Sequence, residues 1–360
     1  MALRVIISGG GTGGHIFPAI AIANALRRIQ PDIEILFVGA EGRMEMEKVP
    51  QAGYSIVGLP IMGIQRSLTL KNLKVPFKIV ASLLKARKII KDFRPHIAIG
   101  VGGYASGPML RTAGFMGVKT LIQEQNSYPG ITNKLLAPKA TNICVAYEGM
   151  EVFFPKDKII LTGNPVRKEV WQVHNKREAA LLHFHLSQEK KTILIIGGSL
   201  GARSINLALE KNALELLQKG YQIIWQTGKN FNSVLQSHPS LKILPFIKEM
   251  DLAYASADII VSRAGAMSIS ELCLIGKPSI LVPSPNVAED HQTKNALALV
   301  QKEAALLVKD NEIGDRLIAT IDSLFSDELR MNALSQNIKA LGKENADEVI
   351  AQKIIEVANS

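Results

Sequence analysis

Two glycine-rich segments of this chain have the composition of anion-binding turns. Residues 9–15 read GGGTGGH and residues 197–202 read GGSLGA, and each segment directly follows a β-branched apolar run. Glycines let the backbone approach a ligand closely, and a following helix presents unpaired N–H groups and the positive end of its dipole. Both segments are therefore predicted to bind diphosphate groups, and two such turns indicate two nucleotide-type folds with a cleft between them.

A histidine stands where the first predicted helix begins. The positive end of a helix dipole disfavours a protonated imidazole, so His15 would stay neutral and able to accept a proton. His15 is therefore a candidate general base. A histidine in this place can also cap the helix or pack locally, and the residues alone leave both interpretations open.

Taken alone, the first turn also fits a dinucleotide-binding protein. Gly9, Gly11 and Gly14 satisfy G-x-G-x-x-G after a predicted strand, and Glu41 follows the next strand. An NAD-dependent oxidoreductase is therefore one alternative. A Walker loop is excluded because no Gly-Lys-Ser/Thr sequence follows the glycines.

The elements that must position these turns alternate along the chain. Strand-like apolar runs separated by helical stretches indicate βαβ units and a parallel sheet. The first series of predicted strands covers residues 3–8, 33–38, 97–101, 120–123, 143–146 and 159–162. The second series covers residues 192–196, 222–226, 242–244, 259–262, 279–282 and 305–308.

The sequence thus predicts an α/β fold of two doubly wound, Rossmann-like domains. Residues 163–167 (GNPVR) break regular structure, so we expect one domain over residues 1–163 and another over residues 164–340. The last residues, 341–360, are predicted to form a helix that packs back on the first domain.

Composition limits the function classes. Of 360 residues, 47% are hydrophobic and 21% charged, which is typical of a globular protein. Cys144 and Cys273 have no partners at metal-ligand spacing, which predicts a reducing compartment without disulfides or a zinc site. No apolar run has the length of a signal peptide or a membrane span. The net charge of +10 would suit nucleic acid, but 5% aromatic residues and the lack of a known motif argue against it.

The positive charge is concentrated in residues 66–94, which contain nine Lys and Arg residues and one Asp. Apolar residues recur there at helical spacing, which predicts an amphipathic helix. Such a helix can lie on an anionic membrane surface, or it can turn its apolar residues to its own core while the lysines are merely solvated. The candidate membrane residues are Leu73, Lys74, Phe77, Lys78 and Lys85.

Seven ordered motifs carry a family resemblance. Beside the two glycine-rich segments they are GVGGYASGP at residues 100–108, EQNSYPGITNK at 124–134, GNPVR at 163–167, SRAGAMSISE at 262–271 and HQTKNA at 291–296. Together they resemble the MurG family of peptidoglycan N-acetylglucosaminyltransferases. The resemblance implies a GT-B architecture of two Rossmann-like domains and transfer of GlcNAc from UDP-GlcNAc to lipid I, giving lipid II.

The resemblance also implies the site residues. Glu271 would accept hydrogen bonds from the ribose, Ser199 would contact the diphosphate, Ile247 the uracil and Gln292 the sugar. The residues implied for donor binding are Thr12, Gly13, Gly14, Asn126, Arg167, Ser199, Ile247, Ala266, Met267, Ser268, Ile269, Ser270, Glu271 and Gln292. Gln123 replaces a histidine common in the family.

For an inverting displacement the candidate bases are His15 and Glu124, and Glu124 could instead orient the acceptor. Gly102, Gly103 and Tyr104 are candidates for binding the acceptor. No Asp-x-Asp pair occurs in the sequence, so neither a metal nor another cofactor is expected.

The implied partners are UDP-GlcNAc, lipid I and an anionic membrane surface, with other cell-wall synthesis proteins as candidates and no nucleic acid. The implied location is peripheral, on the cytoplasmic side of the plasma (inner) membrane. A UDP-GlcNAc epimerase of similar architecture and a non-enzymatic nucleotide-sugar or membrane scaffold stay open beside the oxidoreductase.

Overall fold

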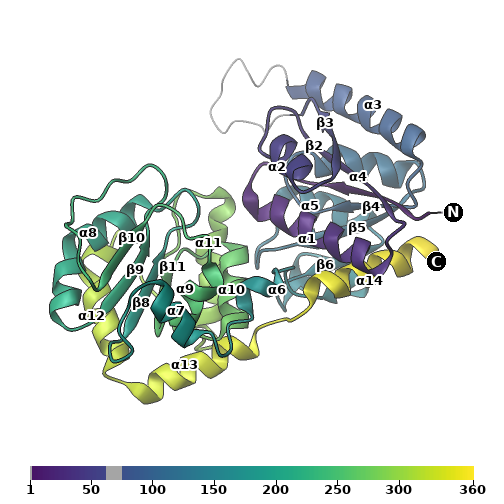
Figure 1. Cartoon of the computed structure of the whole chain (residues 1–360). Helices are drawn as coiled ribbons and strands as arrows, with labels where there is room; N and C mark the ends of the chain where they lie inside the picture. Colours follow the sequence, from purple (N-terminus) through teal and green to yellow (C-terminus); the bar gives the residue numbers. More distant parts are fainter. Residues whose placement is uncertain (1, 62–74) are drawn as a thin grey trace. The chain divides into compact units, whose positions relative to one another are not determined.

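The computed structural model describes residues 2–61 and 75–360 (Figure 1). It divides into two compact units: unit 1 comprises Met1–Val166 and Asn345–Ser360, and unit 2 comprises Arg167–Glu344. The first division falls after Val166, slightly later than the sequence predicted, because Gly163 and Asn164 are bonded into unit 1. The Gly163 amide donates to the carbonyl oxygen of Val145, and the Asn164 side chain donates to that of Gln125.

Unit 1 contains a seven-stranded sheet in the order β3-β2-β1-β4-β5-β6-β7, with every neighbouring pair parallel. Its strands are β1 (Arg4–Ser8), β2 (Glu34–Ala40), β3 (Ser55–Leu59), β4 (Ile97–Gly100), β5 (Lys119–Glu124), β6 (Asn142–Val145) and β7 (Ile159–Leu161). Its helices are α1 (Gly13–Ile29), α2 (Glu45–Gln51), α3 (Val75–Phe93), α4 (Ser106–Phe115), α5 (Ile131–Leu136) and α14 (Ala346–Asn359). The strands predicted from the sequence did not include β3.

Helices cover both faces of this sheet. Successive residues of a strand point to opposite faces, so Val5 and Ile7 of β1 pack with α1 and α14, whereas Ile6 packs in the second cluster with α3 and α4. The last helix, α14, lies against α1, and Arg28 of α1 pairs with Asp347 of α14 at 2.6 Å. The C-terminal segment therefore completes the core of unit 1.

Unit 2 repeats this plan with a six-stranded parallel sheet in the order β10-β9-β8-β11-β12-β13. Its strands are β8 (Thr192–Ile196), β9 (Gln222–Gln226), β10 (Leu241–Leu244), β11 (Ile259–Ser262), β12 (Ser279–Leu281) and β13 (Leu306–Leu307). Its helices are α6 (Lys168–Trp171), α7 (Arg177–His183), α8 (Arg203–Gln218), α9 (Met250–Ser256), α10 (Ala266–Ile275), α11 (His291–Val300), α12 (Ile313–Phe325) and α13 (Glu328–Ala340). The predicted two-domain Rossmann-like fold is confirmed.

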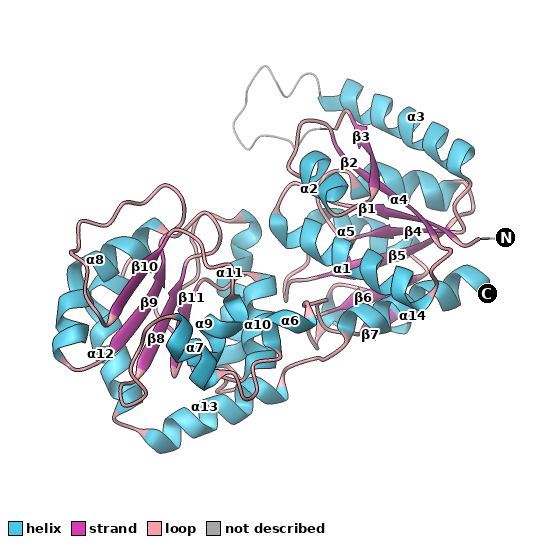
Figure 2. Cartoon of the chain, in the orientation of Figure 1, coloured by secondary structure: helices cyan, strands magenta, loops and turns pink. Residues whose placement is uncertain are grey.

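Each sheet has one point where the strand order reverses direction, between β1 and β4 in unit 1 and between β8 and β11 in unit 2 (Figure 2). In such sheets ligands bind outside the carboxyl ends of the strands at this switch point. The glycine-rich segments follow β1 and β8, so each unit carries one of them at its switch point.

Over residues 2–61 and 75–360, no helix combines the length and the apolar character needed to cross a bilayer.

Candidate active site

The turn after β1 holds the His15 ring in one tautomer. His15 lies in the first turn of α1, where its Nδ1 is 3.0 Å from the carbonyl oxygen of Gly10 and 3.4 Å from Oγ1 of Thr12. A carbonyl oxygen can only accept a hydrogen bond, so Nδ1 carries the proton and the ring lone pair lies on Nε2. Nε2 is therefore the atom of His15 that can accept a proton.

The turn after β4 packs directly against this histidine. The Gly10 amide donates to the carbonyl oxygen of Gly102 at 3.3 Å. A Cβ atom at Gly102 would lie 2.8 Å from His15 Nε2, and one at Gly103 would lie 2.3 Å from the Gly10 oxygen. Both glycines also have positive φ, 97° and 87°. The two turns therefore interlock only as glycine backbone, with half-exposed Tyr104 next in the chain.

Glu45, a residue the sequence did not single out, lies beneath the first turn. It begins α2 and is 1% exposed. Its Oε2 accepts from the Gly11 amide at 2.8 Å, and its Oε1 accepts from the Ala40 amide at 2.9 Å. The carboxylate therefore joins the end of β2 to the glycine turn.

Glu124, the second candidate base, is surrounded by donors. Its Oε1 accepts from the backbone and side-chain nitrogens of Asn126 at 3.0 and 3.2 Å. Its Oε2 accepts from the Gly130 amide at 3.2 Å and from Asn133 Nδ2 at 2.8 Å. The carboxylate is 2% exposed and organises the segment between β5 and α5.

Gln123, at the position where the family commonly has histidine, joins an amide network. Its Nε2 donates to Asn164 Oδ1 at 2.9 Å, and Gln125 Nε2 donates to the Val101 carbonyl oxygen at 2.8 Å. These buried bonds fix the carboxyl ends of β4 and β5 relative to each other.

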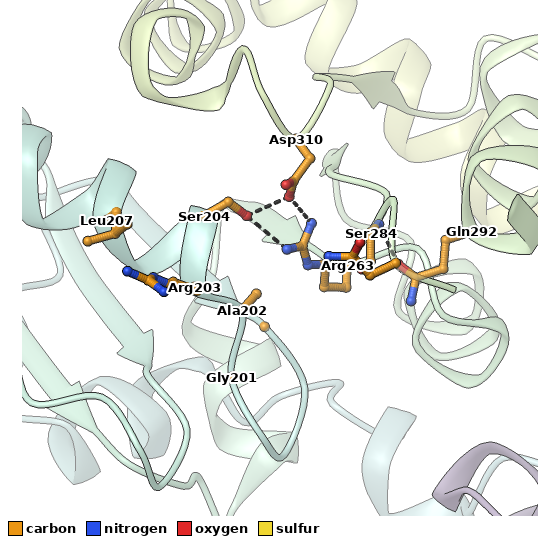
Figure 3. A pocket seen from close by; sticks show the side chains of 11 residues that line it. Gly201, Ala202, Arg203, Ser204, Leu207, Arg263, Ser284, Gln292 and Asp310 are labelled. Atoms are coloured by element: carbon orange, nitrogen blue, oxygen red, sulfur yellow. Dashed lines mark hydrogen bonds and ion pairs between the residues drawn. The ribbon is translucent and has the colours of Figure 1, made fainter. Parts of the chain in front are cut away.

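In unit 2 a pocket of about 540 Å³ opens beside the second glycine-rich turn (Figure 3). Its polar lining includes Arg203, Ser204, Arg263, Ser284, Gln292 and Asp310. Ser199 is exposed on the same β8–α8 turn. Among the described residues no side chain caps the N-terminus of α8, so its first-turn N–H groups can bind an anionic ligand.

Arg263 is a positively charged side chain of this pocket that hydrogen bonds hold in place (Figure 3). Its guanidinium pairs with Asp310, donates to Ser204 Oγ at 2.8 Å and donates to the Val282 carbonyl oxygen at 3.1 Å. The side chain is 13% exposed. Arg263 lies in the motif SRAGAMSISE, but the sequence suggested no role for it. Nothing in the sequence indicated Asp310. Within the described residues no group of three or more His, Cys, Asp or Glu could hold a metal ion.

Glu271 lies on α10 in a partly apolar setting. Tyr254 donates its hydroxyl to Glu271 Oε2 at 2.8 Å. Burial raises the pKa of Glu271, while the Tyr254 hydrogen bond and the charge of Arg167 act in the opposite direction. The implied residues Ala266, Met267, Ser268, Ile269 and Ser270 share the first turns of the same helix, which follows Gly265.

The other implied donor residues of unit 2 occupy separate loops. Gln292 lies in the first turn of α11, and its Oε1 accepts from the Ser284 amide at 2.9 Å. Ile247 is buried, and its backbone amide donates to Oε1 of Gln226 at 2.9 Å. Its backbone carbonyl oxygen is therefore the polar group that could contact a nucleobase. Thr12, Gly13, Gly14 and Asn126 belong to unit 1, whereas Arg167 belongs to unit 2.

The predicted basic helix is α3, and it carries apolar residues on two faces. Ala86, Ile89 and Ile90 are buried in the core, whereas Phe77, Val80 and Leu84 are 79%, 56% and 64% exposed. The exposed three recur at helical spacing, so they share one outward face. Lys85 pairs with Glu41 at 2.8 Å, and Leu73 and Lys74 lie outside the described residues.

Comparison with known proteins agrees with this geometry. Residues 5–145 match the glycosyltransferase family 28 N-terminal domain, and residues 192–354 match the family 28 C-terminal domain. The fold and its two switch-point sites therefore define a family 28 glycosyltransferase of GT-B architecture.

Two curated relatives cover almost the whole chain, and both are named UDP-N-acetylglucosamine--N-acetylmuramyl-(pentapeptide) pyrophosphoryl-undecaprenol N-acetylglucosamine transferase. That of Phocaeicola vulgatus is 58% identical over 99% of this chain and 97% of its own length. That of Bacteroides thetaiotaomicron is 56% identical over 99% and 98%. The crystal structure of Acinetobacter baumannii MurG is 28% identical, with a TM-score of 0.82 over 98% of this chain and 99% of that one. This chain belongs to the MurG family.

Proposed function

We propose that this protein transfers GlcNAc from UDP-GlcNAc to the MurNAc hydroxyl of undecaprenyl-pyrophosphoryl-MurNAc-pentapeptide, lipid I, to form lipid II. The observation that carries the proposal is identity above one half, over 99% of the chain, to relatives named for this transferase. Neither an epimerase nor an NAD-dependent oxidoreductase has comparable support.

The reaction is an inverting displacement at the anomeric carbon of GlcNAc. The acceptor oxygen forms the new bond to this carbon, the bond to the diphosphate oxygen breaks, and UDP leaves with the electron pair. The hydroxyl proton goes to Nε2 of His15, the ring nitrogen that carries the lone pair when Nδ1 donates to Gly10. His15 is therefore proposed as the general base.

Glu124 serves in this proposal as a positioning residue rather than as the base. Its two oxygens already accept from Asn126, Gly130 and Asn133, and a proton on either oxygen would oppose these donors. Its role is to fix the loop that carries Asn126, the residue that we assign to binding of the donor substrate UDP-GlcNAc.

UDP is proposed to bind unit 2. The diphosphate would lie at the N-terminus of α8, near Ser199 and the Arg263 guanidinium, where helix dipole and positive charge stabilise the departing UDP. Glu271 would accept from the ribose hydroxyls, and the Ile247 carbonyl oxygen would accept from the uracil. Gln292 would contact the sugar, and Arg167 is assigned to the same nucleotide.

The acceptor is proposed to bind unit 1 at the interlocked turns. Gly102 and Gly103 place backbone without side chains beside His15, and half-exposed Gly103 can be approached by a diphosphate-linked sugar. Thr12, Gly13 and Gly14 lie at the start of α1 beside these turns and keep their assignment to the UDP-GlcNAc donor, whereas exposed Tyr104 is assigned to the acceptor.

Because lipid I is anchored in a membrane, we further propose that α3 docks on an anionic bilayer surface at the cytoplasmic side. The exposed face of Phe77, Val80 and Leu84 supplies apolar area, and neighbouring basic residues such as Lys78 and Lys88 supply positive charge. Lys85 contributes less because it already pairs with Glu41.

The test is transfer of labelled GlcNAc from UDP-GlcNAc to a short-chain lipid I analogue. Wild type should form the lipid II analogue, and His15→Gln should lower kcat by about 100- to 10,000-fold, the usual contribution of general-base catalysis. Folded wild-type protein that makes no lipid II analogue, or that epimerises free UDP-GlcNAc, would contradict the proposal.

A further inference from the structure

One peptide group in the first turn is hydrogen-bonded on both sides. The peptide joins Gly10 to Gly11, and its carbonyl oxygen lies 3.0 Å from Nδ1 of His15. The amide of the same peptide donates to Oε2 of Glu45 at 2.8 Å. A carboxylate, a peptide and an imidazole therefore form one continuous chain of hydrogen bonds.

The carboxylate at the start of this chain is fixed. Its second oxygen accepts from the Ala40 amide at 2.9 Å, at the end of β2. A Cβ atom at Gly10 would lie 2.2 Å from the Glu45 carboxyl carbon, and one at Gly39 would lie 2.5 Å from its Cγ. Two glycines thus make the space that Glu45 fills, and with 1% exposure it stays out of contact with solvent.

We propose that Glu45 is a positioning residue for the transfer reaction, which acts on His15 through the Gly10–Gly11 peptide. A carboxylate that accepts from the peptide N–H polarises the peptide, and its carbonyl oxygen becomes a stronger acceptor for Nδ1–H. The peptide thus lies between the carboxylate and the imidazole, whereas in Ser-His-Asp triads the carboxylate bonds to the imidazole directly. This inference rests on the proposed role of His15 as the base.

The arrangement meets two opposite demands on a base. Before the reaction the positive end of α1 disfavours the charged form of the imidazole. When Nε2 takes the proton, the ring becomes a cation, and the buried negative charge of Glu45, relayed by the peptide, stabilises it. Other ionisable groups on these elements are Glu41 and Arg43 between β2 and α2, Glu47 and Lys48 on α2, Tyr104 on the second turn and Glu124 at the end of β5. Glu124 is already occupied by its own donors.

The variant that tests the inference is Glu45→Gln, which keeps the shape and removes the charge. We expect kcat for GlcNAc transfer to fall about 10- to 100-fold, as is usual for residues that orient a reactive side chain without contacting the substrate. KM for both substrates should be unchanged. The matched control is Glu47→Gln on the same helix, because Glu47 is 68% exposed and bonds to Lys48 and Gln51. The control should transfer at the wild-type rate.

The ring tautomer of His15 separates positioning from mere structural support. In protein with ¹⁵N-labelled histidine, assigned with His15→Gln, the wild-type ring should be protonated at Nδ1 near pH 8. Glu45→Gln should shift it toward the Nε2-protonated form and lower the pKa of the ring. A folded Glu45→Gln protein with unchanged ring shifts would overturn the inference. So would a wild-type ring protonated at Nε2, a measurement that needs no variant to fold.

The same experiments separate this inference from the proposed function. If His15→Gln abolishes transfer while Glu45→Gln leaves the ring unchanged, the relay is wrong and the base assignment stands. If His15→Gln transfers normally, the base assignment fails, and with it the catalytic role of Glu45.

Discussion

Tyr254 and Glu271 form a hydrogen bond of 2.8 Å inside unit 2, between a fully buried phenol of α9 and a carboxylate of α10. Burial raises the pKa of both groups. The phenol donates to one carboxylate oxygen, so the other oxygen can be directed at the ribose hydroxyls that we assign to Glu271.

Removal of this bond should weaken donor binding. Tyr254→Phe removes one hydrogen bond to the Glu271 carboxylate. We therefore expect KM for UDP-GlcNAc to rise about tenfold, with little change in KM for lipid I. Initial rates at varied donor concentration measure it. Tyr221→Phe is the control, because its hydroxyl bonds to Asp322 instead. Equal KM values for wild type and Tyr254→Phe would contradict the assignment.

The raised pKa of Glu271 predicts that its ionised form lowers the stability of the fold while it contributes to UDP binding. The folded state holds the Glu271 proton more tightly than the unfolded chain, so this carboxyl favours folding below its unfolded pKa and loses that contribution as pH rises through its folded pKa. Glu271→Gln should therefore raise Tm more at pH 8 than at pH 4 and still weaken UDP binding. Thermal unfolding with and without UDP at both pH values measures this. A lower Tm at pH 8 would be the opposite of the prediction.

The Arg263 guanidinium should matter for the diphosphate. Arg263→Lys keeps the charge but cannot bond simultaneously to Asp310, Ser204 and the Val282 carbonyl oxygen, so we expect UDP affinity to fall about tenfold. Isothermal titration with UDP and with uridine separates the effects, because uridine lacks the diphosphate and should bind both proteins equally. Arg316→Lys is the control, since Arg316 pairs with Glu312 at an exposed position.

A methyl group at Gly102 should disable His15. The added Cβ would lie 2.8 Å from the ring and require a φ of 97°, so Gly102→Ala should lower both Tm and kcat. Gly42→Ala introduces a similar backbone strain, φ 69°, with nothing within 4 Å of its Cβ. It should cost about 1 kcal/mol of stability and leave kcat unchanged. If both variants transfer at the same rate, Gly102 does not restrain the base.

The outward face of α3 should hold the protein on anionic vesicles. Phe77→Ser with Leu84→Ser removes two exposed apolar side chains, and Lys78→Glu reverses a charge beside them. We expect each change to reduce sedimentation with phosphatidylglycerol vesicles, and added salt to weaken wild-type binding because exposed charges are screened. Leu329→Ser, at an equally exposed apolar residue of unit 2, should bind like wild type. Undiminished binding of the α3 variants would exclude this face as the docking surface.

The sequence determined the features that depend on local chemistry. Alternating strand and helix patterns predicted two doubly wound domains, and glycine-rich segments after β1 and β8 predicted where each domain would bind its ligand. His15 could be singled out because its position at a helix start is visible along the chain. β3 was missed because a short apolar run has no pattern that separates it from a loop.

Tertiary structure alone decided how the side chains of these sites act. Glu45 reaches the Gly11 amide from 34 residues away, and Asp310 reaches Arg263 from 47. The sequence named Glu124 as a candidate base or as a group that orients the acceptor, and only the structure shows that its two oxygens accept from Asn126, Gly130 and Asn133. Such pairings arise where the sheet order brings distant strand ends and loops together. A linear sequence records which residues can ionise, whereas packing sets the distances, burial and partners that determine what each ionised group does.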